Sequence, residues 1–146
     1  MSALGVDAFD KTLQVTNTWL GEIMEDHGPD RQIAWHILST VLRTLRDRLP
    51  TDLSAHLGAQ LPLLVRGTYY DQFEPSLQPS ETDTLAEFLD KVEKGFAQTR
   101  PVNTTEAVRS VFKVLSHYID PGQVAKVRAA LPKEVRALWP DPMTKN

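Results

Sequence analysis

The sequence lacks cysteine and long apolar runs, and its seven glycines are scattered. Without cysteine, disulfides, thiolate zinc sites and a cysteine nucleophile are excluded. No stretch of about eighteen consecutive apolar residues is present to span a membrane. Residues 1–7 carry no basic segment of the kind that opens a secretory signal. We therefore expect a cytoplasmic protein that does not enter the membrane.

Strong charge of either sign is also missing, since the formal net charge is −3. Residues 1–75 carry six Lys/Arg against ten Asp/Glu, which gives −4, and residues 76–146 carry ten against nine, which gives +1. Binding to a phosphate backbone needs several clustered cations. Neither half has such a cluster, so we do not expect nucleic acid as a partner.

What the sequence does contain is a copy of itself. Residues 37–71 align without a gap to residues 107–141 at an offset of seventy. The pairs include Leu61-Pro62 with Leu131-Pro132 and Val65-Arg66 with Val135-Arg136. The segment before residue 37 aligns with the second half at an offset of about seventy-two. This pattern predicts an internal duplication.

Apolar residues recur at steps of three and four along most of the chain, which is typical of amphipathic helices. Five polar residues stand where helix N-caps are expected, namely Asp7, Asp30, Thr84, Asn103 and Asp120. We predict a single all-α domain over residues 1–146, made of two pseudo-symmetric four-helix halves that form one compact bundle. The first repeat covers 7–73, the linker 74–82 and the second repeat 83–141. The predicted core contains Leu13, Leu20, Ile37, Val41, Leu45, Leu61, Val92, Val111, Leu115, Leu131 and Val135.

Two related segments, GAQLPLLVRGTYYD at 58–71 and AALPKEVRALWPD at 129–141, resemble the bacterial family catalogued as domain of unknown function 2267. FDKTLQVTNTWLGEIM at 9–24, TLRDRLP at 44–50 and EFLDKVEK at 87–94 are also similar to it. The resemblance covers nearly all of residues 9–141. It implies an all-helical duplicated fold, and it supplies no catalytic residues.

Catalytic and metal-binding motifs are not evident. The chain has no Gly-x-Ser-x-Gly, no Ser-x-x-Lys and no phosphate-binding glycine loop. His27, His36, His56 and His117 lie on different predicted elements, and no two of them are three or four residues apart. Convergence of three histidines on a metal stays open at this point, beside the alternative of partly exposed or helix-capping side chains. We name no cofactor.

Arginine and aromatic residues at the ends of the two repeats are the remaining candidates. Arg66 precedes Tyr69 and Tyr70, and Arg136 precedes Trp139. Such an arginine can stack on the ring or donate to the last free carbonyls of a helix, which would serve the fold. Alternatively, these residues contact a partner, because Arg, Tyr and Trp are common at interface hot spots.

Trp19 and Trp35 lie beside the apolar stripes of their helices. We expect both at the half-exposed rim of the core, or together in an apolar surface patch that binds a protein.

These observations favour a non-enzymatic protein-interaction or adaptor module. The alternative is a helical bundle that binds a metal or a small ligand, and this alternative includes an enzyme. Each half can bury its apolar stripe on the other, so we expect a monomer or a weak homodimer. The acidic first half predicts a partner with a basic surface, or head-to-tail pairing, weakened by salt in either case.

Overall fold

The computed structural model describes residues 5–140, and these residues confirm the predicted all-α class. Residue 141, the last of the predicted second repeat, lies outside the described residues. Within 5–140 there are eight α-helices, one short 3-10 helix and no β-strand. The elements are α1 (Asp7–His27), α2 (Arg31–Arg48), α3 (Thr51–Ala59), α4 (Leu63–Tyr70), η1 (Pro75–Leu77), α5 (Leu85–Gly95), α6 (Thr104–Tyr118), α7 (Pro121–Ala129) and α8 (Lys133–Arg136).

Side-chain caps fix four helix starts, and all four were expected from the sequence. The fifth expected cap, Asp7, is wrong, because the extended residue before α1 is Val6 and Asp7 is already the first residue of the helix, which has no side-chain cap. The Asp30 carboxylate accepts hydrogen bonds from two amides in the first turn of α2. Thr84 forms a capping box with Glu87 at the start of α5, while Asn103 and Asp120 cap α6 and α7. These side chains satisfy amides that the helices leave without a carbonyl partner.

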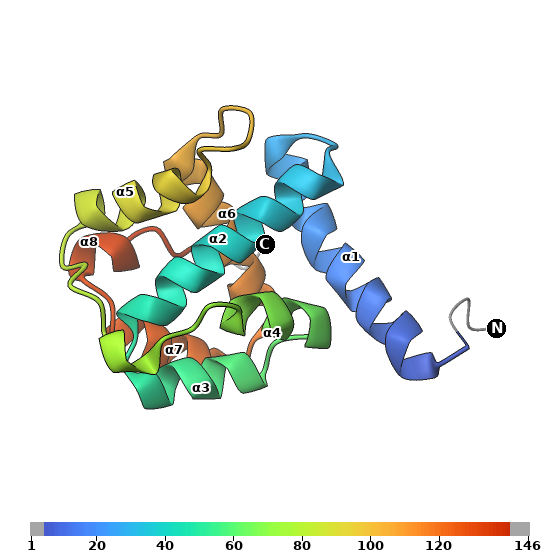
Figure 1. Ribbon diagram of the computed structural model, residues 1–146, viewed down its shortest axis with the longest axis horizontal. Helices are drawn as coiled ribbons and strands as arrows, with labels where there is room; N and C mark the ends of the chain where they lie inside the picture. Colours follow the sequence, from blue (N-terminus) through green and yellow to red (C-terminus); the bar gives the residue numbers. More distant parts are fainter. Residues whose placement is uncertain (1–4, 141–146) are drawn as a thin grey trace.

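The helices α2 and α6 lie at the centre of the bundle and pack against each other (Figure 1). The other helices surround this pair: α1 contacts both of them, α5 contacts both from the opposite side, and α3 lies against α7. Helices from the two ends of the sequence therefore share one core. Val41 and Leu45 of α2 and Val111 of α6 are fully buried in it.

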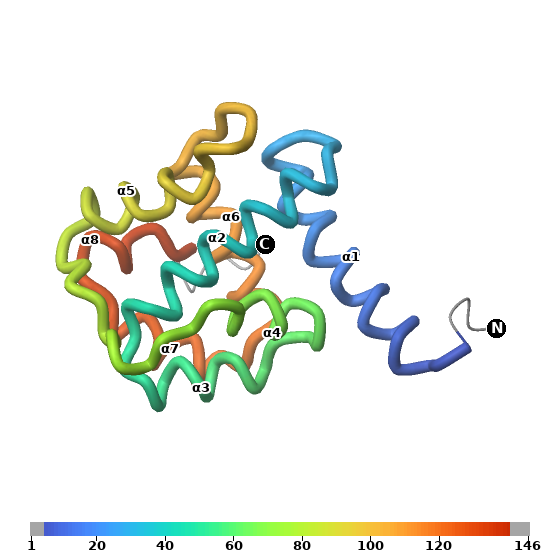
Figure 2. Tube along the Cα trace, viewed as in Figure 1, coloured from blue at the N-terminus to red at the C-terminus, as the bar shows by residue number. Residues whose placement is uncertain are grey.

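The core prediction is wrong for one residue. Leu13 is 40% exposed, whereas the other ten predicted core residues are buried. Figure 2 shows the physical reason, because the first half of α1 extends beyond the rest of the bundle. Leu13 does lie on the apolar face of its helix, but within residues 5–140 no other helix covers it.

None of the helices in residues 5–140 combines the length and the apolar composition needed to cross a membrane.

Candidate functional site

Three of the predicted contact residues are buried, which removes them from the surface. Trp19 is only 1% exposed, and Tyr69 and Trp139 are also in the core. The prediction of a half-exposed Trp19 is wrong because Tyr118 of α6 stacks on its ring at a centroid distance of 5.6 Å. Trp35 is half-buried, as expected. The two tryptophans therefore do not form a joint surface patch.

The arginines of the two repeats hold the ends of helices. Arg66 donates from Nε to the Gly58 carbonyl at 3.0 Å and from Nη2 to the Leu61 carbonyl at 2.9 Å. Arg136 donates from Nη2 to the Leu131 carbonyl at 3.0 Å. Each guanidinium thus satisfies carbonyls that precede a proline break. These bonds confirm the expected capping of free carbonyls.

The aromatic residues that follow these arginines also pack inward. The Tyr69 hydroxyl donates to the Ser54 carbonyl at 2.8 Å, and burial raises the pKa of this hydroxyl. Trp139 stacks on Phe112 with centroids 4.3 Å apart. Tyr70 remains half-buried and meets the edge of Tyr69. Apart from Tyr70, these side chains offer a partner little surface.

The four histidines do not converge. His36 bonds the Gly95 carbonyl, His117 pairs with Glu22 at 2.7 Å, His27 meets Ser110 at 3.1 Å, and His56 is exposed. Within residues 5–140, no three His, Asp or Glu side chains are grouped as metal ligands.

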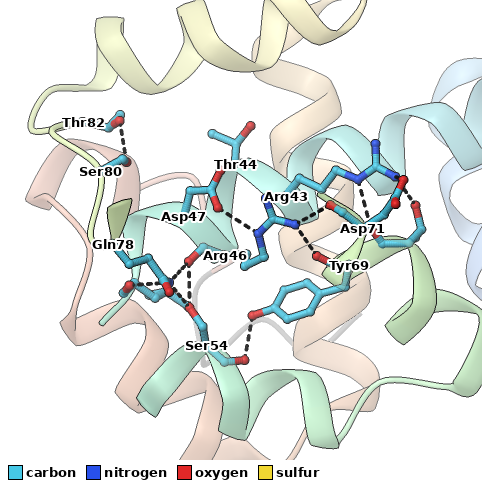
Figure 3. A network of polar contacts seen from close by, with 12 residues as sticks. Arg43, Thr44, Arg46, Asp47, Ser54, Tyr69, Asp71, Gln78, Ser80 and Thr82 are labelled. Atoms are coloured by element: carbon cyan, nitrogen blue, oxygen red, sulfur yellow. Dashed lines mark hydrogen bonds and ion pairs between the residues drawn. The ribbon is translucent and has the colours of Figure 1, made fainter. Parts of the chain in front are cut away.

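A buried arginine organises a polar network between α2, α4 and the linker (Figure 3). Arg46 is 4% exposed, and its Nη1 donates to the carbonyls of Tyr69 at 2.6 Å and Asp71 at 2.9 Å. Its Nε donates to the Asp47 carboxylate at 2.8 Å, and the centroid of the Phe73 ring lies 5.0 Å from the guanidinium carbon. The arginine therefore ties the end of α4 to α2.

Gln78 from the linker completes this network. Its side-chain amide donates to the Leu49 carbonyl at 2.8 Å, to the Arg46 carbonyl and to the Ser54 hydroxyl. Between the linker and α2 lies a crevice of about 310 Å³, with Arg46, Asp47, Glu74, Gln78 and Lys91 among its lining residues. The sequence did not predict this crevice, because the residues that line it come from segments about thirty residues apart.

A second polar cluster joins the end of α1 to α6. The Ser110 hydroxyl donates to the Asp26 carboxylate at 2.7 Å, and Lys113 lies 3.3 Å from the same oxygen. Burial alone raises the pKa of Asp26, but these two partners outweigh it and lower the pKa from 3.8. The Ser110 proton is directed at Asp26 and not at His27. This arrangement is not that of a nucleophilic serine activated by histidine.

Five exposed apolar residues lie at the projecting end of α1 and at the start of α4. They are Val6, just before α1, Phe9 and Leu13 on α1, and Leu63 and Leu64 on α4. The helices α1 and α4 contact each other, and α4 begins on the side that faces α1 (Figure 1). We call these five residues the α1–α4 apolar surface. Exposed apolar groups on two helices that contact each other are typical of protein contact sites.

Comparison with known proteins identifies the family. Residues 16–138 match the model of a family described as an uncharacterized conserved protein, DUF2267. The chain therefore belongs to this family, as the Leu-Pro and Trp-Pro turns suggested. No curated protein matches the chain.

Proposed function

We propose that the protein is a non-enzymatic protein-interaction module, and that it binds its partner through the α1–α4 apolar surface. The observation that carries this proposal is the exposure of Phe9 and Leu13 on a helix that extends beyond its own bundle. A helical segment that projects into water is marginally stable without packing. A bound protein would supply that packing.

The predicted aromatic and arginine contacts need revision within this proposal. Tyr69, Trp19 and Trp139 are buried, and Arg66 and Arg136 are bonded to helix ends. We therefore place the contact with a partner at the first turns of α1 and not at the ends of the repeats. Among the predicted residues, Trp35 and Tyr70 keep partial exposure and remain available at the margin of an interface.

The duplicated architecture belongs to the same proposal. We infer two related four-helix halves, α1–α4 and α5–α8. Several packings of one half have a counterpart in the other: α1 lies on α2 as α5 lies on α6, and α1 contacts α6 as α5 contacts α2. The bounds of α3 and α7 differ by seventy positions. The second half lacks a projecting first helix, because α5 has 11 residues and α1 has 21.

Photo-cross-linking tests the interaction. A photoreactive phenylalanine analogue at position 9 should link the protein to a defined partner in cells, whereas the same analogue at exposed Ala86 on α5 should not. Binding of the purified partner should then weaken in a Leu13→Glu variant. If position 9 gives no cross-linked protein, or if Leu13→Glu leaves binding unchanged, the proposal is wrong.

A second candidate is a small anionic ligand in the Arg46 crevice. The specific observation is that Nη2 of Arg46 makes no hydrogen bond to any residue in 5–140, while Lys91 lines the same crevice. Two cations can bind a carboxylate or a phosphate, here against repulsion from Asp47 and Glu74, which line the same crevice. Calorimetric titration with inorganic phosphate and acetate tests this, and saturable binding that Lys91→Ala removes and Lys94→Ala keeps would support it.

Zinc or iron found in stoichiometric amount in untagged protein would instead favour the metal-binding alternative.

A further inference from the structure

The apolar stripe of α1 is covered over only half of its length. Along α1, Phe9, Leu13, Thr16, Leu20 and Ile23 follow one another at alternating steps of four and three residues, the spacing of helices that pack side by side. Val6 is the extended residue just before this helix. Thr16, Leu20 and Ile23 are buried in the bundle. Phe9 is 49% exposed and Leu13 40% exposed on the same face. The first half of the stripe therefore has the pattern of a helix interface without the neighbouring helix.

The missing helix needs an uncovered stripe of the same spacing. Among residues 5–140, the exposed large apolar side chains are Val6, Phe9, Leu13, Val15, Leu63, Leu64, Leu77 and Tyr118. Among the helices in that range, only α1 carries two of them four residues apart on one face, namely Phe9 and Leu13. A second α1 is therefore a matched partner for the first.

The charges beside the stripe are compatible with antiparallel pairing of two α1 helices. With Phe9 packed beside Leu13 of the second copy, Asp10 lies beside Thr12 of that copy. No two carboxylates of the first three turns then face each other across the stripe. The pairing is isologous, so the same surface serves both copies.

The area of the surface predicts a weak dimer. With half-exposed side chains, the five residues would bury on the order of 300 Å² of apolar area per copy. Because little more than half of a typical interface is apolar, the total interface is about 1,000 Å². Interfaces below about 1,200 Å² belong to weak and transient complexes.

We propose that the partner of the α1–α4 apolar surface is a second copy of this chain, joined through antiparallel packing of the first turns of the two α1 helices. This inference rests on the proposed interaction function and names its partner. Because the contact is apolar and the first half of each copy is acidic, salt screens repulsion without weakening the contact. This salt response is opposite to the one expected for a charge-driven pair.

Sedimentation equilibrium over a wide concentration range tests the dimer. We expect reversible dimerisation with a dissociation constant in the micromolar range, unchanged or tighter between about 0.05 and 0.5 M salt. Leu13→Glu should raise the dissociation constant at least about tenfold, because it places a charge in the apolar contact.

A matched control separates the contact from general effects on α1. Val15→Glu introduces the same charge on the same helix at a site of similar exposure, 37%, but off the stripe. It should leave the dissociation constant within about threefold. Phe9→Glu provides a second stripe variant if Leu13→Glu alters the helix content measured by circular dichroism.

A distance measurement tests the antiparallel arrangement. Since the chain has no cysteine, Lys11→Cys gives a single site for a spin label. In this register position 11 is level with the two-fold axis but lies on the face of α1 opposite the stripe. Two labels there should therefore be separated by both helices, at a double electron–electron resonance distance of about 20–30 Å, given helix diameters of about 10–12 Å. A longer distance in the dimer would overturn this arrangement.

The outcomes distinguish this inference from the broader function. A monomer at all concentrations that still cross-links from position 9 to another protein overturns the homodimer and keeps the interaction function. A monomer with no cross-link overturns both. A dimer that loosens in high salt, or that responds equally to Leu13→Glu and Val15→Glu, overturns the antiparallel α1 contact.

Discussion

The hydroxyl of Tyr69 donates to the main-chain carbonyl of Ser54 at 2.8 Å, inside the core of the first half. It links the last turn of α4 to α3. The neighbouring Tyr70 hydroxyl makes no hydrogen bond to residues 5–140, so the two adjacent tyrosines form a natural comparison.

Tyr69→Phe should lower the free energy of unfolding by about 1 kcal/mol, because one buried hydrogen bond is lost while the ring is kept. Tyr70→Phe should change it by less than about 0.5 kcal/mol. Urea denaturation followed by circular dichroism measures both values. Equal losses would mean that the Tyr69 bond adds nothing specific.

The Leu-Pro turns should be critical in both halves. Leu61 and Leu131 are buried in the turns after α3 and α7, next to Pro62 and Pro132, which precede α4 and α8. Replacing either leucine by alanine should cost about 2–5 kcal/mol, since it opens a cavity in the core. Leu63→Ala and Lys133→Ala, at exposed positions two residues later, serve as controls in dilute protein. Losses below about 1 kcal/mol at both leucines would contradict their role in the core.

Removal of the Arg46 guanidinium should destabilise the fold more than removal of a surface arginine. Arg46→Met keeps the apolar stem but leaves the Tyr69 and Asp71 carbonyls without this donor, at a cost of about 2–4 kcal/mol. Arg109→Met removes an exposed ion pair within α6 and should cost less than about 0.5 kcal/mol. Thermal unfolding of both variants provides the measurement, and a similar shift in the two would refute the expectation.

The Asp26 cluster should contribute a pH dependence on the acid side. The native pKa of Asp26 lies below 3.8, so its ionised form stabilises the fold above that pH. This contribution is lost as the pH falls through the native pKa. Ser110→Ala should raise the pKa of Asp26, because the carboxylate loses a hydrogen bond. Carbon NMR titration of the Asp26 carboxyl detects the change, while Ser116→Ala should leave the pKa unaltered.

Features that depend on neighbouring residues were predicted well from the sequence. Burial of a side chain by a distant segment was not. Asp30 and Thr84 cap helices as expected, because a cap depends on residues within one turn. The pattern also identified the apolar face on which Leu13 lies. It could not show that α1 extends beyond the neighbouring helices at Leu13, since this depends on the length of those helices.

The candidate sites depended on contacts that no short pattern encodes. Trp19 is buried because Tyr118, almost a hundred positions away, covers its ring. Ser110 meets Asp26 across 84 positions. Arg66 was predictable in part, because its carbonyl partners lie within eight residues.

The attachment of Gln78 to the first half decides where the chain can be divided. The predicted linker began at residue 74, but Gln78 bonds Leu49 and Ser54, and the Ser80 amide donates to the Asp47 carbonyl at 2.7 Å. A fragment that stops at residue 73 would leave these groups facing water. The natural place to cut, or to insert a flexible tether, is therefore just before Thr84, where the capping box of α5 begins.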